Sequence, residues 1–118
     1  MRTVTIGSET TILNRIRIYI AGPMRGYDDD NFPAFYEAEK QLELKKVYEI
    51  LNPARMDDEE HPYDHDVNNV DYKAAMKRDI DAIFNSHAIY MLRGWERSDG
   101  ARAEHALAVY LGLSIQYQ

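Results

Sequence analysis

Several residue types and sequence features are missing from this chain, and each absence excludes a class of protein. Its 118 residues include no cysteine, which excludes disulfide bonds, cysteine-ligated zinc and thiol catalysis. No apolar run approaches the ~20 residues of a transmembrane helix. The N-terminus also lacks the apolar region of a signal peptide. We therefore expect a cytoplasmic protein that does not bind membranes.

Positive charge is also scarce. The chain has 14 Lys and Arg residues against 20 Asp and Glu residues, which gives a net charge of −6. This balance argues against binding to a nucleic-acid polymer. A small anion can still bind, because local arginines and helix N-termini attract it whatever the net charge. The length suits a single domain, which we assign to residues 1–118.

The apolar pattern alternates between the spacing of strands and that of helices. Short runs rich in β-branched and aromatic residues predict four strands, over residues 15–20, 47–51, 88–92 and 113–116. Helical spacing predicts helices over residues 32–46, from 71 onward and over 100–111. Residues 1–14 predict either an edge strand or a loose arm. The acidic stretch 54–70 predicts a long loop or a partly ordered flap.

Two helices carry recognisable ends. Asn31 is the expected N-cap of the first helix, with Pro33 in the first turn. Gly112 is the expected C-terminal cap of the last helix. The inward face of that last helix is predicted from apolar spacing to be Ala103, Ala106, Leu107, Tyr110 and Leu111.

The alternation of strands and helices predicts an α/β fold. We expect a single-domain, flavodoxin/Rossmann-like three-layer sandwich with a parallel sheet of four to five strands and core order 2-1-3-4. Ligands bind at the carboxyl ends of such strands, where the strand order reverses. In this chain that point lies between the loops at residues 21–26 and 93–102. Both loops contain more polar residues and glycines than a simple turn needs.

Two carboxylates are the candidate catalytic groups. Glu104 falls near the start of the last helix beside its apolar stripe, so its side chain can face the crevice. A first-turn Glu favoured by the helix dipole is the equally weighted alternative. Asp79 takes the place of a core residue in the stripe Met76, Asp79, Ile80 and Ile83. A salt bridge to a neighbouring Arg is its alternative role. Paired carboxylates of this kind suit glycosidic chemistry.

The two loops also suggest an anion site. Gly22 and Gly26 permit close approach of the backbone, and Arg25 offers a forked cationic donor. Ser98, Asp99 and Gly100 lie where the free N–H groups of the last helix attract anions. Ordinary capping of that helix by Ser98 or Asp99 is the simpler interpretation.

Other residues carry less specific signals. Trp95 is suited to stacking on a base, or equally to covering a sheet edge or contacting another subunit. Tyr19 is predicted to belong to the core. His61, Asp64, His65 and Asp66 match known metal-ligand spacings poorly, so we predict a solvated loop and no metal. We also predict no cofactor.

Three motifs give the chain a resemblance to a known family. They are I-Y-I-A-G-P-M at 18–24, N-F-P-A-F at 31–35, and G-W-E-R-S-D-G-A-R-A-E at 94–104. From Arg15 onward the chain resembles the nucleoside 2-deoxyribosyltransferase-like superfamily, in particular a small bacterial and phage branch. It is also similar to the deoxynucleoside 5′-monophosphate N-glycosidases.

The resemblance implies roles for individual residues. Glu104 matches the family's nucleophile, and Asp79 matches an Asp near the sugar and base. Ser98 matches a phosphate-binding Ser of the N-glycosidases, where transferases commonly have Asp; Asp99 is the residue that would replace that acid here. The segment Gly22-Pro23-Met24-Arg25-Gly26 contains a match to the N-glycosidase phosphate loop, and Trp95 and Gly100 complete the expected substrate contacts.

The favoured function is therefore cleavage of the N-glycosidic bond of a (deoxy)nucleoside 5′-monophosphate through a glutamate nucleophile, with release of the free base. One alternative is a nucleoside 2-deoxyribosyltransferase that exchanges bases. Another is a non-catalytic nucleotide-binding or sensor protein. A flavodoxin-like FMN protein is disfavoured because the first loop lacks a Ser/Thr-rich phosphate cradle. The resemblance also implies a homodimer or a higher homo-oligomer.

Overall fold

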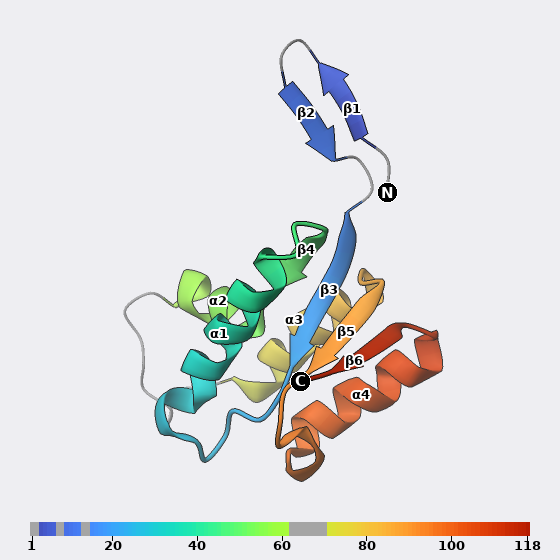
Figure 1. Cartoon of the computed structure of the whole chain (residues 1–118). Helices are drawn as coiled ribbons and strands as arrows, with labels where there is room; N and C mark the ends of the chain where they lie inside the picture. Colours follow the sequence, from blue (N-terminus) through green and yellow to red (C-terminus); the bar gives the residue numbers. More distant parts are fainter. Residues whose placement is uncertain (1–2, 7–8, 13–14, 62–70) are drawn as a thin grey trace.

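A four-stranded parallel sheet forms the centre of the fold (Figure 1). The computed structural model describes residues 3–6, 9–12, 15–61 and 71–118. The sheet order is β4-β3-β5-β6, and the strands are Ile16–Ala21 (β3), Tyr48–Leu51 (β4), Ala88–Met91 (β5) and Ser114–Tyr117 (β6). All three strand pairs are parallel. Counted along the chain this order is 2-1-3-4, so the predicted fold class and strand order are confirmed.

The central strand β3 is buried on both faces. Ile18 and Ile20 point to one face of the sheet, whereas Tyr19 and Ala21 point to the other, as the two-residue period of a strand requires. On the first face they pack against α1 (Phe32–Glu43) and α2 (Pro53–Glu60), through Phe35, Ala38, Leu42 and Ala54. On the second face they pack against α3 (Tyr72–Phe84) and α4 (Asp99–Leu111), through Ile83 and Ala108. These are the three layers that the sequence predicts.

The first helix is shorter than predicted and begins differently. Helix α1 spans Phe32–Glu43 and does not continue to residue 46. Asn31 is the last residue of a short 3-10 turn, η1 (Asp28–Asn31), which directly precedes the helix. Its side chain caps no helical N–H group. Instead, Asn31 has a φ of 61° and its Nδ2 donates to the Pro23 carbonyl at 2.8 Å. Asn31 therefore fastens the start of α1 to the loop that follows β3.

Part of the predicted loop at 54–70 is a helix. Helix α2 spans Pro53–Glu60, and the Asn52 side chain caps it by accepting a hydrogen bond from the Ala54 N–H at 3.0 Å. The prediction failed because the acidic sequence lacks an apolar stripe. The cap, a Pro in the first turn and the burial of Ala54 are enough to form the helix. Residues 62–70 lie outside the described residues.

Helices α3 (Tyr72–Phe84) and α4 (Asp99–Leu111) cover the second face of the sheet. Asp71 caps α3 by accepting from the Ala74 N–H at 3.0 Å. Gly112 ends α4 with a φ of 74°, as predicted.

The predicted inward face of α4 is wrong for most of its residues. The buried residues are Ala101, Glu104 and Ala108, and Leu107 and Leu111 are half-buried. The other predicted inward residues are exposed: Ala103, Ala106 and Tyr110. Small side chains let the helix lie close to the sheet, so the apolar spacing in the sequence does not mark the face that packs.

The N-terminal residues form a separate hairpin. Strands β1 (Thr3–Ile6) and β2 (Glu9–Ile12) pair with each other in an antiparallel sheet of their own (Figure 1). They do not extend the central sheet, so of the two alternatives for this segment, an edge strand or an arm, the edge strand is excluded. Within the described ranges, no helix has the length and apolar character needed to cross a membrane.

Candidate active site

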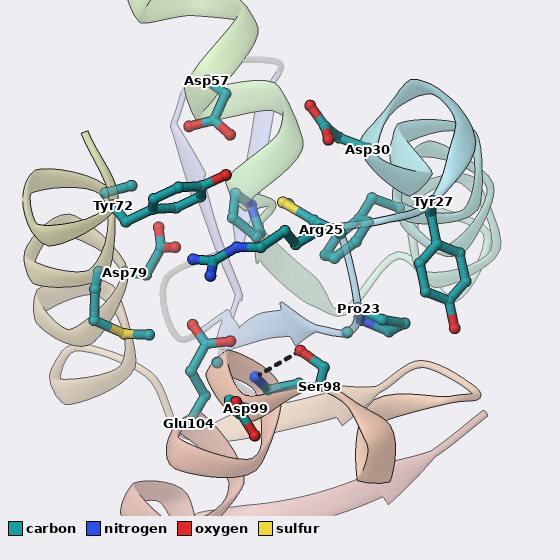
Figure 2. Close-up of a pocket in the computed structure, with 18 of the residues that line it drawn as sticks. Pro23, Arg25, Tyr27, Asp30, Asp57, Tyr72, Asp79, Ser98, Asp99 and Glu104 are labelled. Carbon is teal, nitrogen blue, oxygen red and sulfur yellow. Dashed lines mark hydrogen bonds between the residues drawn. The ribbon is translucent and has the colours of Figure 1, made fainter. Parts of the chain in front are cut away.

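A cavity of about 330 Å³ opens at the carboxyl ends of β3 and β5, where the fold predicts a ligand site. Its walls come from the loop after β3, from α2 and α3, and from the start of α4 (Figure 2). The structure brings together most of the predicted site residues, which are Gly22, Pro23, Met24, Arg25, Asp79, Ser98, Asp99, Gly100 and Glu104. Gly26 and Trp95 are not among the residues that line the cavity.

Glu104 lies at the base of this cavity and is 6% exposed. The hydroxyl of Tyr19, which is fully buried on β3, donates a hydrogen bond to Glu104 Oε2 at 2.5 Å. Burial raises the pKa of the Glu104 carboxyl to about 8, while the hydrogen bond from Tyr19 opposes that increase. Burial and the nearby Glu104 charge in turn raise the pKa of Tyr19 well above its usual value. Glu104 is thus a largely buried carboxyl group that Tyr19 holds in one orientation at the wall of the cavity.

Asp79 projects from α3 into the same cavity (Figure 2). Arg78, its neighbour in the sequence, donates to Asp79 Oδ1 from Nε at 3.0 Å and from Nη2 at 2.7 Å. The alternative role of Asp79 as a salt-bridge partner is therefore present, although the carboxyl also lines the cavity. Burial raises the pKa of Asp79 to about 6, and Arg78 opposes this rise.

The loop after β3 contributes a positively charged side chain to the cavity. The Arg25 guanidinium lies over the ring of Tyr72, with Cζ at 3.7 Å from the ring centroid. Figure 2 shows the Arg25 side chain reaching across the cavity toward the carboxylates of Asp79 and Glu104. Arg97 adds a second cation to the lining, beside the start of α4. The two arginines give the cavity a region that suits an anionic group.

The N-terminus of α4 faces the same region. Ser98 caps the helix, because its Oγ accepts from the Ala101 N–H at 3.2 Å. The simpler interpretation of Ser98 as a helix cap therefore applies, and its hydroxyl hydrogen is still available to a ligand. Asp99 is fully exposed and lies 3.8 Å from an Arg102 nitrogen. Gly100 lines the cavity beside them.

Gly22 and Gly26, in the loop after β3, meet different structural requirements. A Cβ on Gly22 would lie 2.7 Å from the Leu92 Cβ, so the loops after β3 and β5 can approach each other only with Gly at this position. Gly26 has a φ of 86°, which favours glycine, and its surroundings are open. The close approach at Gly22 thus brings the two cavity loops together.

Trp95 does not line the cavity. It lies in a 3-10 turn, η3 (Trp95–Arg97), and its ring stacks on His105 with the centroids 4.2 Å apart. It also packs against the core on the side of α3 and α4. This placement corresponds to the expected covering of the sheet, and we do not propose Trp95 as a ligand contact.

The sequence interpretation missed several residues that line the cavity. Tyr19 was assigned to the core, and it is both fully buried and bonded to Glu104. The cavity lining also includes Arg78, Tyr72 and Asp57, to which the sequence patterns assign no place in the site. Arg78 directly precedes Asp79, and the expected salt bridge between Asp79 and a neighbouring Arg is the signal that points to it.

The described residues contain no cluster of acids and histidines that could hold a metal ion. Of the four candidate residues in the acidic segment, His61 is described and exposed. Asp64, His65 and Asp66 lie outside the described residues.

Comparisons with known proteins address the fold. The sequence model of the family described as "Domain of unknown function (DUF4406)" matches residues 16–117. No curated protein sequence gives a match. Among solved structures, a 2-deoxyribosyltransferase from Leishmania mexicana is similar, with a TM-score of 0.60 and 24% sequence identity. The match covers 86% of this chain and 63% of that chain, so this chain spans less than two thirds of that protein's length. The likeness shows a nucleoside 2-deoxyribosyltransferase-like fold, as the motifs predict.

Proposed function

The chain belongs to the DUF4406 family, whose description states no function, and we propose from its site that it cleaves the N-glycosidic bond of a (deoxy)nucleoside 5′-monophosphate and releases the free base. The observation that carries this proposal is the buried Glu104, oriented by the Tyr19 hydroxyl at the base of the cavity. A carboxylate that is buried, fixed in direction and open to a ligand cavity is suited to attack an electrophilic carbon. The structural likeness to a protein named as a deoxyribosyltransferase supports a nucleoside as the ligand.

The reaction divides into two displacements at C1′ of the sugar. A Glu104 oxygen forms a bond to C1′ as the C1′–N bond breaks, and the bonding electron pair leaves with the base. Water then attacks C1′ of the resulting ester, its hydroxyl stays on the sugar, and the carboxylate is released. The base takes up one proton as it leaves, and the attacking water releases one proton, so the protons of the two displacements balance. Asp79 accepts a hydrogen bond from the base or from a sugar hydroxyl throughout.

The preference for a 5′-monophosphate rests on two arginines and a helix N-terminus in the same cavity. Arg25 and Arg97 line it together with Ser98 and Gly100 at the start of α4. A guanidinium and the free N–H groups of a helix are the donors that bind phosphate well. We expect a nucleotide to bind with its phosphate at these groups and its C1′ over Glu104.

Glu104→Gln tests the proposal directly. Gln keeps the shape of the side chain but cannot supply the attacking oxygen, so release of free base should fall by at least about 10³-fold. The substrates are ribo- and deoxynucleosides and their 5′-monophosphates, and chromatography follows the free base. Glu96→Gln is the matched control, because Glu96 is exposed and lies outside the cavity lining. A Glu104→Gln enzyme with wild-type turnover would contradict the role of Glu104.

Base exchange is the second candidate, and the likeness to the Leishmania mexicana transferase favours it. The same assay separates the two functions. A glycosidase releases base in water alone, whereas a transferase forms a new nucleoside when a second base is supplied. Binding of a nucleotide without either product would identify a sensor.

A further inference from the structure

The guanidinium of Arg78 connects two helices and one of the cavity carboxylates. On α3, two of its nitrogens, Nε and Nη2, donate to the same oxygen of Asp79, Oδ1. Its third nitrogen, Nη1, donates to Asp57 Oδ1 at 2.6 Å and to Glu60 Oε2 at 3.1 Å, both on α2. Only 18% of the Arg78 side chain is exposed. One arginine is thus shared among three carboxylates.

This arrangement needs both helices. Consecutive residues on a helix point about 100° apart, so a residue and its immediate neighbour do not normally face each other. The Arg78 side chain reaches back to Asp79 while Asp57 and Glu60 hold its far nitrogen from α2. The two acids on α2 therefore help to fix where the guanidinium lies.

The hydrogen bonds from Arg78 involve only one of the two carboxylate oxygens of Asp79. Both bonds from Arg78 end on Oδ1, and neither uses Oδ2. A carboxylate oxygen with this anchoring leaves the second oxygen to face a ligand. The side chain is 15% exposed, and Asp79 lines the cavity.

We propose that Arg78 is a positioning residue for Asp79: anchored by Asp57 and Glu60, it keeps the Asp79 carboxylate ionised and presents Oδ2 to the nucleoside. The proposal rests on the proposed function, since the ligand of Oδ2 is the base or a sugar hydroxyl. Arg78 acts mainly through Asp79, although its charge also lowers the pKa of Glu104, and it does not itself take part in the reaction at C1′.

Several charged and titratable groups influence Asp79. Burial in the cavity favours its neutral form, whereas Arg78 and, to a smaller extent, the Tyr19 hydroxyl favour its ionised form. The Asp57 carboxylate on α2 also favours the neutral form. The groups to be considered around Asp79 are Arg78 from α3, Asp57 and Glu60 from α2, Tyr19 from β3, Glu104 from α4 and Arg25 from the loop after β3. Of these, Arg78 is the cation in direct contact.

Titration of Asp79 by NMR of its carboxyl carbon tests the proposal in the full chain without any substrate. The pKa of Asp79 is about 6. Arg78→Gln removes the charge and should raise that pKa by about 1 pH unit or more. Arg78→Lys keeps the charge and should leave the pKa closer to its wild-type value. Lys77→Gln is the matched control, because Lys77 lies one residue away, is 81% exposed and should leave the Asp79 pKa unchanged.

Kinetics on the same variants test the positioning. Arg78→Lys retains charge but not the fork that reaches Asp79 and α2 together. We therefore expect kcat for base release to fall by about 10- to 100-fold in both Arg78 variants. Thermal melts followed by circular dichroism identify any variant that fails to fold.

The outcomes separate this proposal from the proposed function. An unchanged Asp79 pKa in a folded Arg78→Gln variant would overturn the effect of Arg78 on ionisation. Wild-type kcat in Arg78→Lys would overturn the positioning. If the wild-type protein releases no base from any nucleotide, the proposed function fails, and the positioning of Asp79 for a nucleoside fails with it. The NMR comparison still decides whether Arg78 holds Asp79 ionised.

Discussion

At the scale of single residues, burial and the hydrogen bond from Tyr19 have the largest effects on the protonation of Glu104, and the charges of Asp79 and Arg78 have smaller ones. Burial favours the neutral acid, whereas the hydrogen bond from Tyr19 favours the carboxylate. Burial has the larger effect, so the pKa of Glu104 lies near 8. A nucleophile must be ionised, and in the free enzyme its ionised fraction therefore grows as the pH rises toward and beyond 8.

Tyr19→Phe tests this balance. A hydrogen bond to a charged group contributes about 1.5–3 kcal/mol. One pKa unit corresponds to about 1.4 kcal/mol. Loss of the Tyr19 hydroxyl should therefore move the rise of kcat/KM with pH upward by about 1 to 2 pH units. The measurement is kcat/KM for base release between pH 5 and pH 10, which reports the free enzyme.

Tyr90→Phe is the matched control for that measurement. Tyr90 lies on β5 and packs on the opposite face of the sheet, away from the cavity. Its profile should superimpose on that of the wild type. If Tyr19→Phe also leaves the profile in place, then the hydrogen bond does not assist ionisation of Glu104.

The sequence predicted the two cavity carboxylates for different reasons. Asp79 is a charged residue at a position where the helical pattern calls for a packed side chain, and such a residue needs a partner or a function. Glu104 lies beside the predicted apolar stripe at the start of the last helix, and the resemblance to a family with a glutamate nucleophile marked it. Tyr19 gave no such signal, because a tyrosine in a buried strand satisfies the pattern of a core residue. Its contact with Glu104 joins residues 85 positions apart, and the local pattern contains no information on that pairing.

At the scale of elements, the start of α4 combines a structural and a binding role. Ser98 caps the helix through its hydroxyl oxygen. The same residue lines the cavity where we place the phosphate. A substitution that keeps the cap but changes the charge can separate the two roles.

Ser98→Asp is that substitution. Asp caps a helix about as well as Ser and suits the positive end of the helix dipole, so the melting temperature should stay close to that of the wild type. Its negative charge should repel the phosphate and raise KM for the monophosphate by about tenfold or more, with a smaller effect on the unphosphorylated nucleoside. Ser98→Ala, in contrast, should cost about 1 kcal/mol of stability. Equal effects of Ser98→Asp on both substrates would place the phosphate elsewhere.

Helices α2 and α4 show where sequence patterns are insufficient. The eight-residue α2 is predominantly acidic and polar, yet Asn52 and Pro53 mark its beginning. Contacts with other helices also hold α2 in place, because Arg55 and Asp57 form ion pairs with residues of α1 and α3. The periodicity of the α2 sequence contains no information on these contacts. For α4 the large apolar residues pointed to the wrong face. Ala101 and Ala108 pack closely because they are small, a feature that apolar spacing ranks low.

At the scale of the whole molecule, the fold followed from the order of elements. Alternating strands and helices leave few topologies when crossovers are right-handed, and 2-1-3-4 is the simplest of them. That topology brings the loops after β3 and β5 together, and with them the site. The single domain, the cytoplasmic location and the homo-oligomer stay predictions. Exposed apolar side chains on α4, including Val109 and Tyr110, are available for self-association.

The buried Glu104 also links the stability of the whole fold to pH. Its usual pKa is 4.5, and in the folded protein it is about 8. The folded state therefore holds the proton more tightly than the unfolded state. Stability from this group is fully present below pH 4.5 and declines as the pH rises toward 8. Asp79 acts in the same direction between its usual pKa of 3.8 and about 6.

Glu104→Gln should remove the larger part of this pH dependence, because Gln stays neutral at every pH. We expect its free energy of unfolding to match the wild type near pH 4 and to exceed it at pH 9 by on the order of a few kcal/mol. Urea denaturation at both pH values measures the difference, and Glu96→Gln should track the wild type at each. A gain of the same size at pH 4 and pH 9 would mean that Glu104 keeps a normal pKa. Glu104 would then reduce stability only through its packing, so the test separates the charge of this carboxyl from its shape. A gain confined to high pH would show that the fold retains a buried acid at a cost in stability, as expected of a residue kept for its chemistry.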